Sequence, residues 1–563
     1  MTGQTRRTTR RTGPRAKGSP RGRILLAMAT FVIVYGVIGG RLVALGLQPE
    51  PEQVFRQTAA DAVQAARPDI VDRNGEILAT DLSTASLFAE PRNIIDPDEA
   101  VEALATVFPE LGTARVRAQL ASEAGFVWLR REITATERQR IHDLGIPGIG
   151  FLNENRRFYP GGATAGHIVG HVNVDNQGIA GLEKYVDGTG LAALQAAGLA
   201  RTGKEMEPVR LSVDLRVQHA VRDELGRAME RYRAKAAVGI VLDADTCEVL
   251  AMVSLPDYDP NIPAQALEQD RMNRATAGVF ELGSIFKTFT TAMALDSGRV
   301  GMNSRFDARA PLRVGRHSID DFHAKRRVMS VPEVFIYSSN IGTAKMALAA
   351  GIEQQRKFLA RIGMFDRLPS ELPEMARPMR PAGWSEITAI TVSFGHGLSV
   401  SPMHAAVGAA ALMNGGWLMA PTFFPRDVAE ARRGAVQVVS EQTSGAMREL
   451  FWLNARSGSG RRAQVPGFRV GGKTGTAEKA VNGRYDADKR LNSFLAAFPM
   501  DDPRYVVLVV LDEPKPEAGQ HAATAGLNAA PTVANIVSRI GPMLRVPPRF
   551  DAPESPLLVS YGR

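Results

Sequence analysis

Cysteine is nearly absent from this sequence, because Cys247 is the only one in 563 residues. A chain with one thiol forms no internal disulfide, so its folding does not depend on an oxidising compartment. Cys247 lies beside a turn-like stretch within 242–252, and no histidine or asparagine accompanies it in a pattern typical of a cysteine nucleophile. We therefore interpret Cys247 as a packing thiol.

The body of the chain also lacks an excess of either charge. Eight of the nine net positive charges come from residues 1–23, which hold eight of the 68 lysine and arginine residues and no acidic residue. The other 60 basic residues are balanced by 59 acidic ones. Nucleic-acid binding needs a basic face, so we expect no nucleic-acid partner.

Long apolar runs are absent except for one, from Ile24 to Leu47, in which Arg41 is the only charged residue. Its first 17 residues would form about 25 Å of helix, close to the roughly 30 Å of a hydrocarbon core. We predict a single transmembrane helix over 24–47, with the basic tail 1–23 in the cytoplasm and the rest exported. A cleaved signal peptide is the alternative, but its apolar core usually has only ~7–15 residues. Arg41 marks either the outer membrane interface or a polymerase contact.

The chain is too long for one hydrophobic core, and its first exported unit is predicted over 48–205. Asn74-Gly75 joins two short apolar runs within 67–81, which is a strong hairpin signal. Hydrophobic periodicity then predicts a mixture of helices and one strand: helices over 98–108, 113–123 and 135–145, and a strand over 126–133.

His167 and His171 are four residues apart, a spacing that binds zinc when it occurs on a helix. Their surroundings are rich in glycine and supply no evident third ligand, so we interpret them as structural histidines. We expect neither a metal nor a cofactor.

The second unit is predicted over 206–546, followed by a loose tail over 547–563. Strand patterns occur near both of its ends, and the stretch 283–455 between them is largely helical. The pattern predicts an α+β fold, in which an antiparallel sheet carries flanking helices and a helical subdomain. The expected elements are a strand and helix in 209–225, two strands in 236–256, strands in 469–478, 491–499 and 505–514, and a helix over 529–544.

Ser284 and Lys287 form the only S-x-x-K in the chain. Gly283 permits a tight turn into a helix that begins near Ser284, which places Lys287 on the same face one turn later. A serine needs a base, and a lysine must be neutral to serve as one. Burial, the helix N-terminus and a second cation favour the neutral form, and Lys473 is the candidate second cation.

Two further polar motifs follow in order, Ser338-Ser339-Asn340 and Lys473-Thr474-Gly475-Thr476. Ser338 would relay a proton between Lys287 and a leaving amine, and Asn340 would hold a substrate amide. The alternative for the first motif is a helix cap, and the two roles are compatible.

The segment from Lys473 to Thr476 follows two glycines and predicts a strand edge that an extended peptide can join. Lys473, Thr474 and Thr476 would then meet a substrate carboxylate beside Gly475. The backbone N–H groups of Ser284 and Thr476 are the expected oxyanion donors. His396 lines the cleft or belongs to a loop, and both readings stay open, while 455–463 is predicted to be a mobile basic loop.

Seven stretches together resemble the class B penicillin-binding proteins, specifically the division-associated D,D-transpeptidases of the FtsI type, through about residue 545. They are RPDIVDRNGEILATD, GIAGLEK, LDADTCEVLAMVSLPDYDPN, ELGSIFKTFT, YSSNIGTAK, FGHGLSVSP and VPGFRVGGKTGTAEK.

This resemblance implies a pedestal (dimerisation-type) domain followed by a transpeptidase domain that cross-links peptidoglycan stem peptides. A peptide ending in D-Ala-D-Ala would acylate Ser284, D-Ala would leave, and an amine of a neighbouring stem would accept the acyl group. β-Lactams would acylate the same serine. The implied partners are the membrane polymerase FtsW and other division proteins, and the implied location is the inner membrane at the septum, with the catalytic domain in the periplasm.

Asn340 fits the division type better than the elongation type, which often carries aspartate there. Leu282 replaces a frequent proline of the family, and Cys247 stands where glycine is frequent. Three alternatives remain: an elongation-type transpeptidase, a carboxypeptidase or β-lactam hydrolase, and a catalytically silent division scaffold.

Overall fold

The computed structural model describes residues 28–29, 31–32, 35–39, 67–190, 207–481 and 484–550. None of the helices within these ranges is both long and apolar enough to cross a membrane. The predicted anchor over 24–47 and the basic tail before it fall largely or wholly outside the described ranges, as does the C-terminal tail from residue 551. The chain divides into units 1–64 and 65–563, and the second contains the elements that follow.

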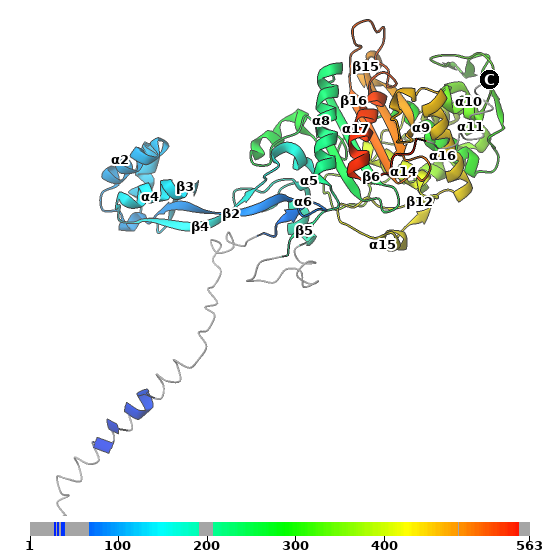
Figure 1. Ribbon diagram of the computed structural model, residues 1–563. Coiled ribbons are helices and arrows are strands. Elements are labelled where there is room, and N and C mark those ends of the chain that lie inside the picture. Colours follow the sequence, from blue (N-terminus) through cyan, green and yellow to red (C-terminus); the bar gives the residue numbers. More distant parts are fainter. Residues whose placement is uncertain are drawn as a thin grey trace, which may run out of the picture. The chain divides into compact units, whose positions relative to one another are not determined.

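A first sheet confirms the predicted hairpin. Strand β1 (Ile70–Val71) pairs antiparallel with β2 (Ile77–Ala89), and Gly75 in the turn has φ +95°. Strands β3 (Val127–Ile133) and β4 (Ile149–Phe158) flank β2 on its two sides, as Figure 1 shows in blue and cyan.

Strand β5 (Val209–Arg210) completes this sheet by pairing parallel with β1. The backbone N–H of Val209 donates to the carbonyl of Asp69 at 2.7 Å, and that of Leu211 donates to Val71 at 2.8 Å. This segment lies at the start of the second predicted unit, 206–546. The first residues of that unit therefore belong to the sheet of the first unit.

Three predicted helices of this region are confirmed, namely α2 (Pro97–Val107), α3 (Ala114–Leu120) and α4 (Ala135–Asp143). Each helix has an N-cap residue whose side chain accepts a hydrogen bond from a backbone N–H of the first turn. The N-cap residues are Asp96, Thr113 and Thr134 respectively. Their buried faces pack against the predicted strand, which is β3, and against β2 to form one apolar core.

His167 and His171 are structural, as predicted. His167 Nε2 bonds the carbonyl of Arg271 at 2.6 Å, and His171 Nδ1 bonds the hydroxyl of Tyr258 at 3.2 Å. Both rings pack edge-on against Tyr258. Short helices α5 (Gly166–Val169) and α6 (Gly181–Tyr185) border this contact.

The second sheet matches the prediction of strands contributed from both ends of a unit. Its order is β14 (Gly471–Val481), β15 (Arg484–Phe498), β16 (Tyr505–Asp512), β6 (Ala236–Asp243) and β7 (Val249–Leu255), with every neighbouring pair antiparallel. Strand β14 therefore lies at an edge of the sheet.

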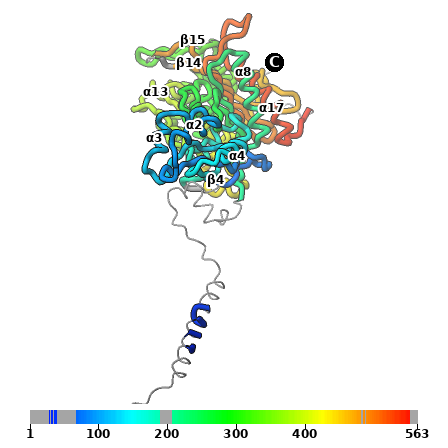
Figure 2. The backbone as a smooth tube through the Cα atoms, turned by 90° about the vertical axis from the view of Figure 1, so that its left-hand side faces the viewer, coloured from blue at the N-terminus to red at the C-terminus, as the bar shows by residue number. Residues whose placement is uncertain are grey.

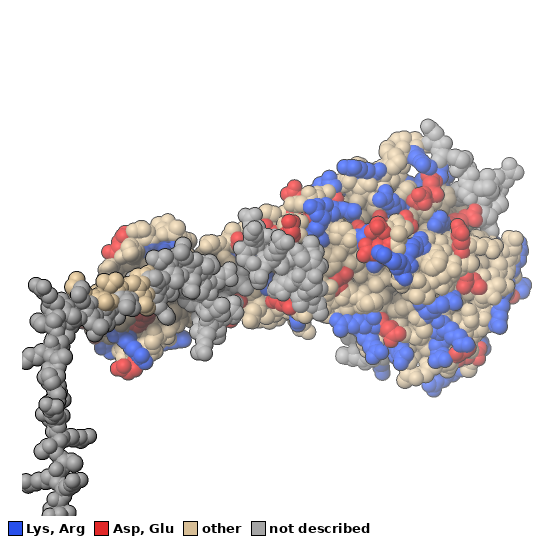
Figure 3. Space-filling model, turned by 90° about the horizontal axis from the view of Figure 1, so that it is seen from below, with Lys and Arg blue, Asp and Glu red and all other residues tan. Residues whose placement is uncertain are grey.

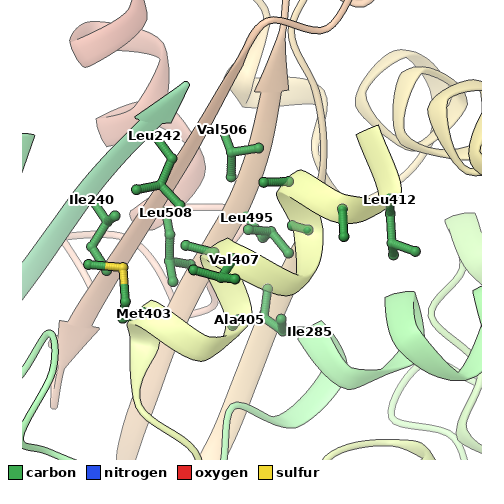
Figure 4. Packing of buried hydrophobic residues seen from close by; sticks show 14 of the residues in the cluster. Ile240, Leu242, Ile285, Met403, Ala405, Val407, Leu412, Leu495, Val506 and Leu508 are labelled. Atoms are coloured by element: carbon green, nitrogen blue, oxygen red, sulfur yellow. The ribbon is translucent and has the colours of Figure 1, made fainter. Parts of the chain in front are cut away.

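Helices α8 (Leu215–Tyr232) and α17 (Ala529–Met543) pack against this sheet in one apolar core. They lie side by side in Figure 1 and again in Figure 2, which is turned by 90°. Helix α14 (Pro402–Met413) packs in a second core with side chains of the sheet, and Figure 4 shows Met403 and Val407 close to Ile240, Leu495 and Leu508.

The stretch 283–455 is largely helical, as predicted, although it also contains short strands that the sequence did not predict. Its helices are α9 (Phe286–Asp296), α10 (Val331–Ile336), α11 (Asn340–Ala350), α12 (Ile352–Arg361), α13 (Glu386–Ser393), α14, α15 (Val428–Arg433) and α16 (Glu441–Ser457). The strand pairs are β8 (Arg305–Asp307) with β11 (Val328–Ser330), β9 (Leu312–Val314) with β10 (His317–Ile319), and β12 (Trp417–Leu418) with β13 (Val436–Gln437).

Cys247 is buried in the turn between β6 and β7, and this burial raises the pKa of its thiol to about 12, which confirms a packing role. Its φ of +55° lies in the left-handed region, where glycine is the residue with the least strain.

On the face shown in Figure 3, basic and acidic side chains are interspersed.

Candidate active site

Ser284 lies in a tight turn at the entrance of α9. Gly283 has φ +54°, and residues Gly283–Ile285 form one 3-10 turn before the α-helix begins at Phe286. Ile285, Phe286 and Phe289 are fully buried, as their apolar character predicts. The turn is packed tightly, because a Cβ on Gly395 would lie 2.0 Å from the carbonyl oxygen of Gly283.

Lys287 is buried one turn after Ser284, with 1% of its surface exposed. Its Nζ donates to the backbone carbonyl of Ser338 and to Ser338 Oγ at 3.2 Å. Burial, followed by the nearby charge of Lys473, holds the pKa of Lys287 well below its ordinary value, while Asp321 acts in the opposite direction. Lys287 is therefore biased toward the neutral amine that a general base requires.

Ser338 occupies the connection between α10 and α11 with φ +54°, an uncommon conformation for a residue other than glycine. Lys473 Nζ donates to Ser338 Oγ at 3.0 Å, so two lysines converge on one hydroxyl. The predicted helix cap is also present, but Ser339 provides it, with its Oγ accepting from the N–H of Gly342 at 2.9 Å.

Lys473 is completely buried on β14, and burial lowers its pKa to about 7. Its Nζ also approaches the carbonyl of Thr474 at 3.3 Å and lies 5.7 Å from the ring centre of Phe335. The ammonium thus faces Ser338 in the interior, whereas Thr474 and Thr476 from the same strand line the cavity in front of it.

Close packing fixes β14 against the turn that carries Ser284. A Cβ on Gly475 would lie 2.4 Å from Ser493 Oγ and 2.6 Å from the carbonyl oxygen of Leu282. Thr474 Oγ1 is 2.6 Å from Ser459 Oγ, and Thr476 Oγ1 accepts from the N–H of Ala525 at 3.2 Å. The edge of β14 opposite β15 has no strand neighbour within the described sheet, as peptide addition requires.

A cavity of about 850 Å³ brings most of the predicted residues together. It is lined by Ser284, Lys287, Ser338, Asn340, Thr474 and Thr476, and further by Phe322, His323, Tyr337, Phe394, His396, Gly458, Ser459, Arg461, Arg462, Glu478, Arg490, Thr524, Gly526 and Leu527. Asn340 also donates through Nδ2 to the carbonyl of Asp320 at 3.0 Å.

The basic segment 455–463 is only in part the loop that we predicted, because its first three residues end helix α16 and Arg461–Ala463 form a 3-10 turn. Asn454 Nδ2 donates to the carbonyl of Gly472 at 2.6 Å, and its Oδ1 accepts from the N–H of Ser459 at 3.2 Å. Gly458, Ser459, Arg461 and Arg462 consequently form one wall of the cavity. The sequence gives no local signal for this position, because the contact of Asn454 with Gly472 joins the end of α16 to strand β14.

His396 lines the cavity from the loop that follows α13, so both readings left open by the sequence hold. Its ring packs edge-on against Tyr485 with centroids 5.3 Å apart, and Tyr485 in turn bonds Glu281 Oε2 at 3.0 Å. Burial lowers the pKa of His396, and its Nδ1 has no hydrogen-bond partner among the described residues.

Two family models match the chain. Residues 237–538 match the penicillin binding protein transpeptidase domain, and residues 62–190 match the penicillin-binding protein dimerisation domain.

Among curated proteins, the chain is 40% identical over 499 residues to the probable peptidoglycan D,D-transpeptidase FtsI of Caulobacter vibrioides, covering 86% of this chain and 83% of that protein. It is 29% identical over 526 residues to the peptidoglycan D,D-transpeptidase FtsI of Escherichia coli, covering 88% and 86% respectively.

Among solved structures, the chain resembles the apo transpeptidase domain of penicillin-binding protein 3 from Burkholderia pseudomallei, with 33% identity and a TM-score of 0.54 over 61% of this chain and 98% of that one. Penicillin-binding protein 3 from Mycobacterium tuberculosis, solved with aztreonam, shares the fold with a TM-score of 0.65 at 24% identity over 87% of this chain and 99% of that one.

Proposed function

The chain belongs to the class B penicillin-binding proteins of the FtsI type, and we propose that it is a D,D-transpeptidase that cross-links peptidoglycan stem peptides through a serine acyl-enzyme. The observation that carries the catalytic assignment is the convergence of Lys287 and Lys473 on Ser338 Oγ, beside a cavity that also contains Ser284.

In the acylation step, Ser284 Oγ attacks the carbonyl carbon between the two terminal D-Ala residues of a stem peptide. Neutral Lys287 takes the hydroxyl proton as the C–O bond forms. The C–N bond then breaks, and the departing D-Ala amine takes a proton that reaches it through Ser338. Transfer repeats the sequence in reverse, with the amine of a neighbouring stem attacking the ester and Ser284 recovering its proton.

Substrate binding is assigned to β14. An extended peptide adds to the open edge of this strand, and the hydroxyls of Thr474 and Thr476 bind its terminal carboxylate beside Gly475. Lys473 supports this anion from behind the hydroxyls and holds Ser338. The side-chain amide of Asn340 contacts the peptide, and the N–H groups of Ser284 and Thr476 stabilise the oxyanion.

The test is a cross-linking reaction with the purified full-length protein, a peptide ending in D-Ala-D-Ala and a peptide that carries an acceptor amine. We expect release of D-Ala together with a new amide between the two peptides, and neither with Ser284→Ala. Release of D-Ala without amide formation would favour a carboxypeptidase, and rapid turnover of bound penicillin would favour a β-lactam hydrolase.

The chain acts in septal wall synthesis, is anchored in the inner membrane by residues 24–47, and works with the polymerase FtsW and other division proteins; the apolar run and the FtsI relatives support this. The pedestal covers 48–205, the transpeptidase domain covers 206–546, and β-lactams acylate Ser284.

A fluorescent fusion at midcell would support septal synthesis, whereas a side-wall pattern would favour the elongation type. Normal division by cells whose only copy carries Ser284→Ala would instead support a silent scaffold. Recovery of FtsW with the wild-type chain would support the partner assignment, and the same recovery with Arg41→Leu would leave Arg41 as a membrane-interface residue.

A further inference from the structure

A carboxylate outside the three sequence motifs contacts the turn that carries Ser338. Asp321 follows strand β10 and lies across the N-terminus of α11. Its Oδ2 accepts from the hydroxyl of Ser339 at 2.7 Å, and its Oδ1 accepts from the backbone N–H of Ile341 at 2.9 Å. One side chain thereby bridges two points of the turn, one of them next to Ser338.

This turn needs external support, because Ser338 has a left-handed φ of +54° that is unfavourable for a residue with a Cβ. Helix α11 already has an N-cap, since Ser339 Oγ accepts from Gly342 N–H at 2.9 Å. The hydroxyl of Ser339 therefore donates its proton to Asp321, while its oxygen accepts from the first turn of the helix. A negative charge at this position is also stabilised by the positive end of α11.

The same carboxylate acts electrostatically on the catalytic centre. Two charged groups from different elements act on Lys287, namely Lys473 on β14 and Asp321 after β10, and the charge of Lys287 in turn lowers the pKa of His396 in the loop that follows α13. Burial and Lys473 lower the pKa of Lys287, whereas Asp321 raises it. Asp321 thus limits how far this pKa falls.

We propose that Asp321 is a positioning residue for acyl transfer, holding Ser338 between Lys287 and Lys473 through its two hydrogen bonds to the turn that begins α11. The inference depends on the proposed acyl-transfer function and adds a residue to it. Asp321 acts on the site through Ser339 and Ile341 and not through Ser284.

The test compares Asp321→Asn and Asp321→Ala with Asp320→Asn, which removes the same charge one residue earlier. The Asp320 side chain is exposed, pairs with Arg326 and accepts from the N–H of Asp321 at 2.8 Å, a bond that the amide oxygen of asparagine also accepts, so Asp320→Asn is a matched control. Fluorescent penicillin reports the acylation rate of each full-length protein across a pH series, and thermal melting reports its folding. Labelling of the wild type is measured first, because its absence would reject the proposed function rather than this inference.

We expect Asp321→Ala to lower the acylation rate at least about tenfold, since it removes two hydrogen bonds to a charged acceptor. Asp321→Asn keeps the shape and removes the charge, so the acid side of its pH profile moves to lower pH by several tenths of a unit. Asp320→Asn matches the wild type in both readouts.

Two results would overturn the proposal. One is acylation within twofold of wild type in both Asp321 variants with an unmoved pH profile. The other is a rate loss in Asp321→Ala that merely follows a loss of folded protein, with Asp321→Asn unchanged in rate and profile, because a purely structural residue would behave in this way.

Discussion

At the scale of single residues, the site depends on two lysines that are buried next to one hydroxyl. Removing an ammonium from water disfavours its charge, and a second ammonium nearby disfavours it further. The sequence predicted this arrangement because S-x-x-K, S-x-N and K-T-G are each local. It did not predict His323, Ser459 or Arg490, because chain segments far from the motifs bring them to the cavity.

Replacing Lys287 with alanine removes the proposed base, and we expect the rate of penicillin acylation to fall by about 10²–10⁴-fold. Lys345→Ala is the control, since this lysine on α11 bonds the carbonyl of Asp307 instead. Stopped-flow fluorescence measures both rates. Labelling of Lys287→Ala within a few-fold of wild type would remove Lys287 from the role of base.

Lys473→Met should stabilise the fold while it impairs acylation. Burial lowers the pKa of Lys473 from about 10.5 to about 7, so the unfolded chain binds this proton more tightly than the folded one. Wild-type stability therefore falls as pH drops from 10.5 to 7, and the variant lacks that loss. In urea unfolding, we expect the free energy of unfolding of the variant to exceed that of the wild type by roughly 1–3 kcal/mol at pH 7. This difference shrinks toward pH 10. A gain that does not depend on pH would contradict this explanation.

At the scale of elements, the strand β14 is held against the Ser284 turn by contacts that only glycine permits. Long helices and strands were predictable because their periodicity is local, including all five strands of the second sheet. The pairing of β5 with β1 was not predictable, because two-residue strands carry almost no pattern. The strands near Asp321 were missed for a similar reason, since each has three residues.

Gly475→Ala tests this contact between elements. The added Cβ would overlap Ser493 Oγ and the carbonyl of Leu282. We therefore expect the free energy of unfolding to fall by about 1–3 kcal/mol and the acylation rate to fall as well. Gly445→Ala on α16 is the matched control, because nothing lies within 4 Å of its added Cβ and alanine favours a helix. We expect a lower melting temperature and slower penicillin labelling for Gly475→Ala than for Gly445→Ala. Equal values for the two variants would show that β14 can shift without harm to the fold or the site.

At the scale of the whole molecule, a buried ion network ties together segments that lie far apart in the chain. The carboxylate of Glu183 is fully buried and bonds Arg157 Nε at 2.6 Å and Arg67 Nε at 2.9 Å. Arg157 also reaches Asp81 at 3.1 Å. The sequence identifies this stretch only through its family resemblance, because no local pattern pairs a glutamate with arginines 26 and 116 residues away.

Glu183→Ala leaves two guanidinium groups without their buried partner, and we expect a loss of about 3–5 kcal/mol in the free energy of unfolding. Asp98→Ala breaks an exposed pair with Arg117 and should leave the melting temperature almost unchanged. Chemical unfolding of both variants checks the comparison. Equal, small losses would mean that water replaces the network without penalty.

The central claim, that Ser284 is the acylated nucleophile, is tested most directly by locating the covalent adduct. The full-length protein is treated with penicillin, digested, and the modified peptide is sequenced by mass spectrometry. The account predicts one adduct, on Ser284 in the peptide that contains Lys287, and none in Ser284→Ala. An adduct on any other residue, or undiminished labelling of Ser284→Ala, would contradict it.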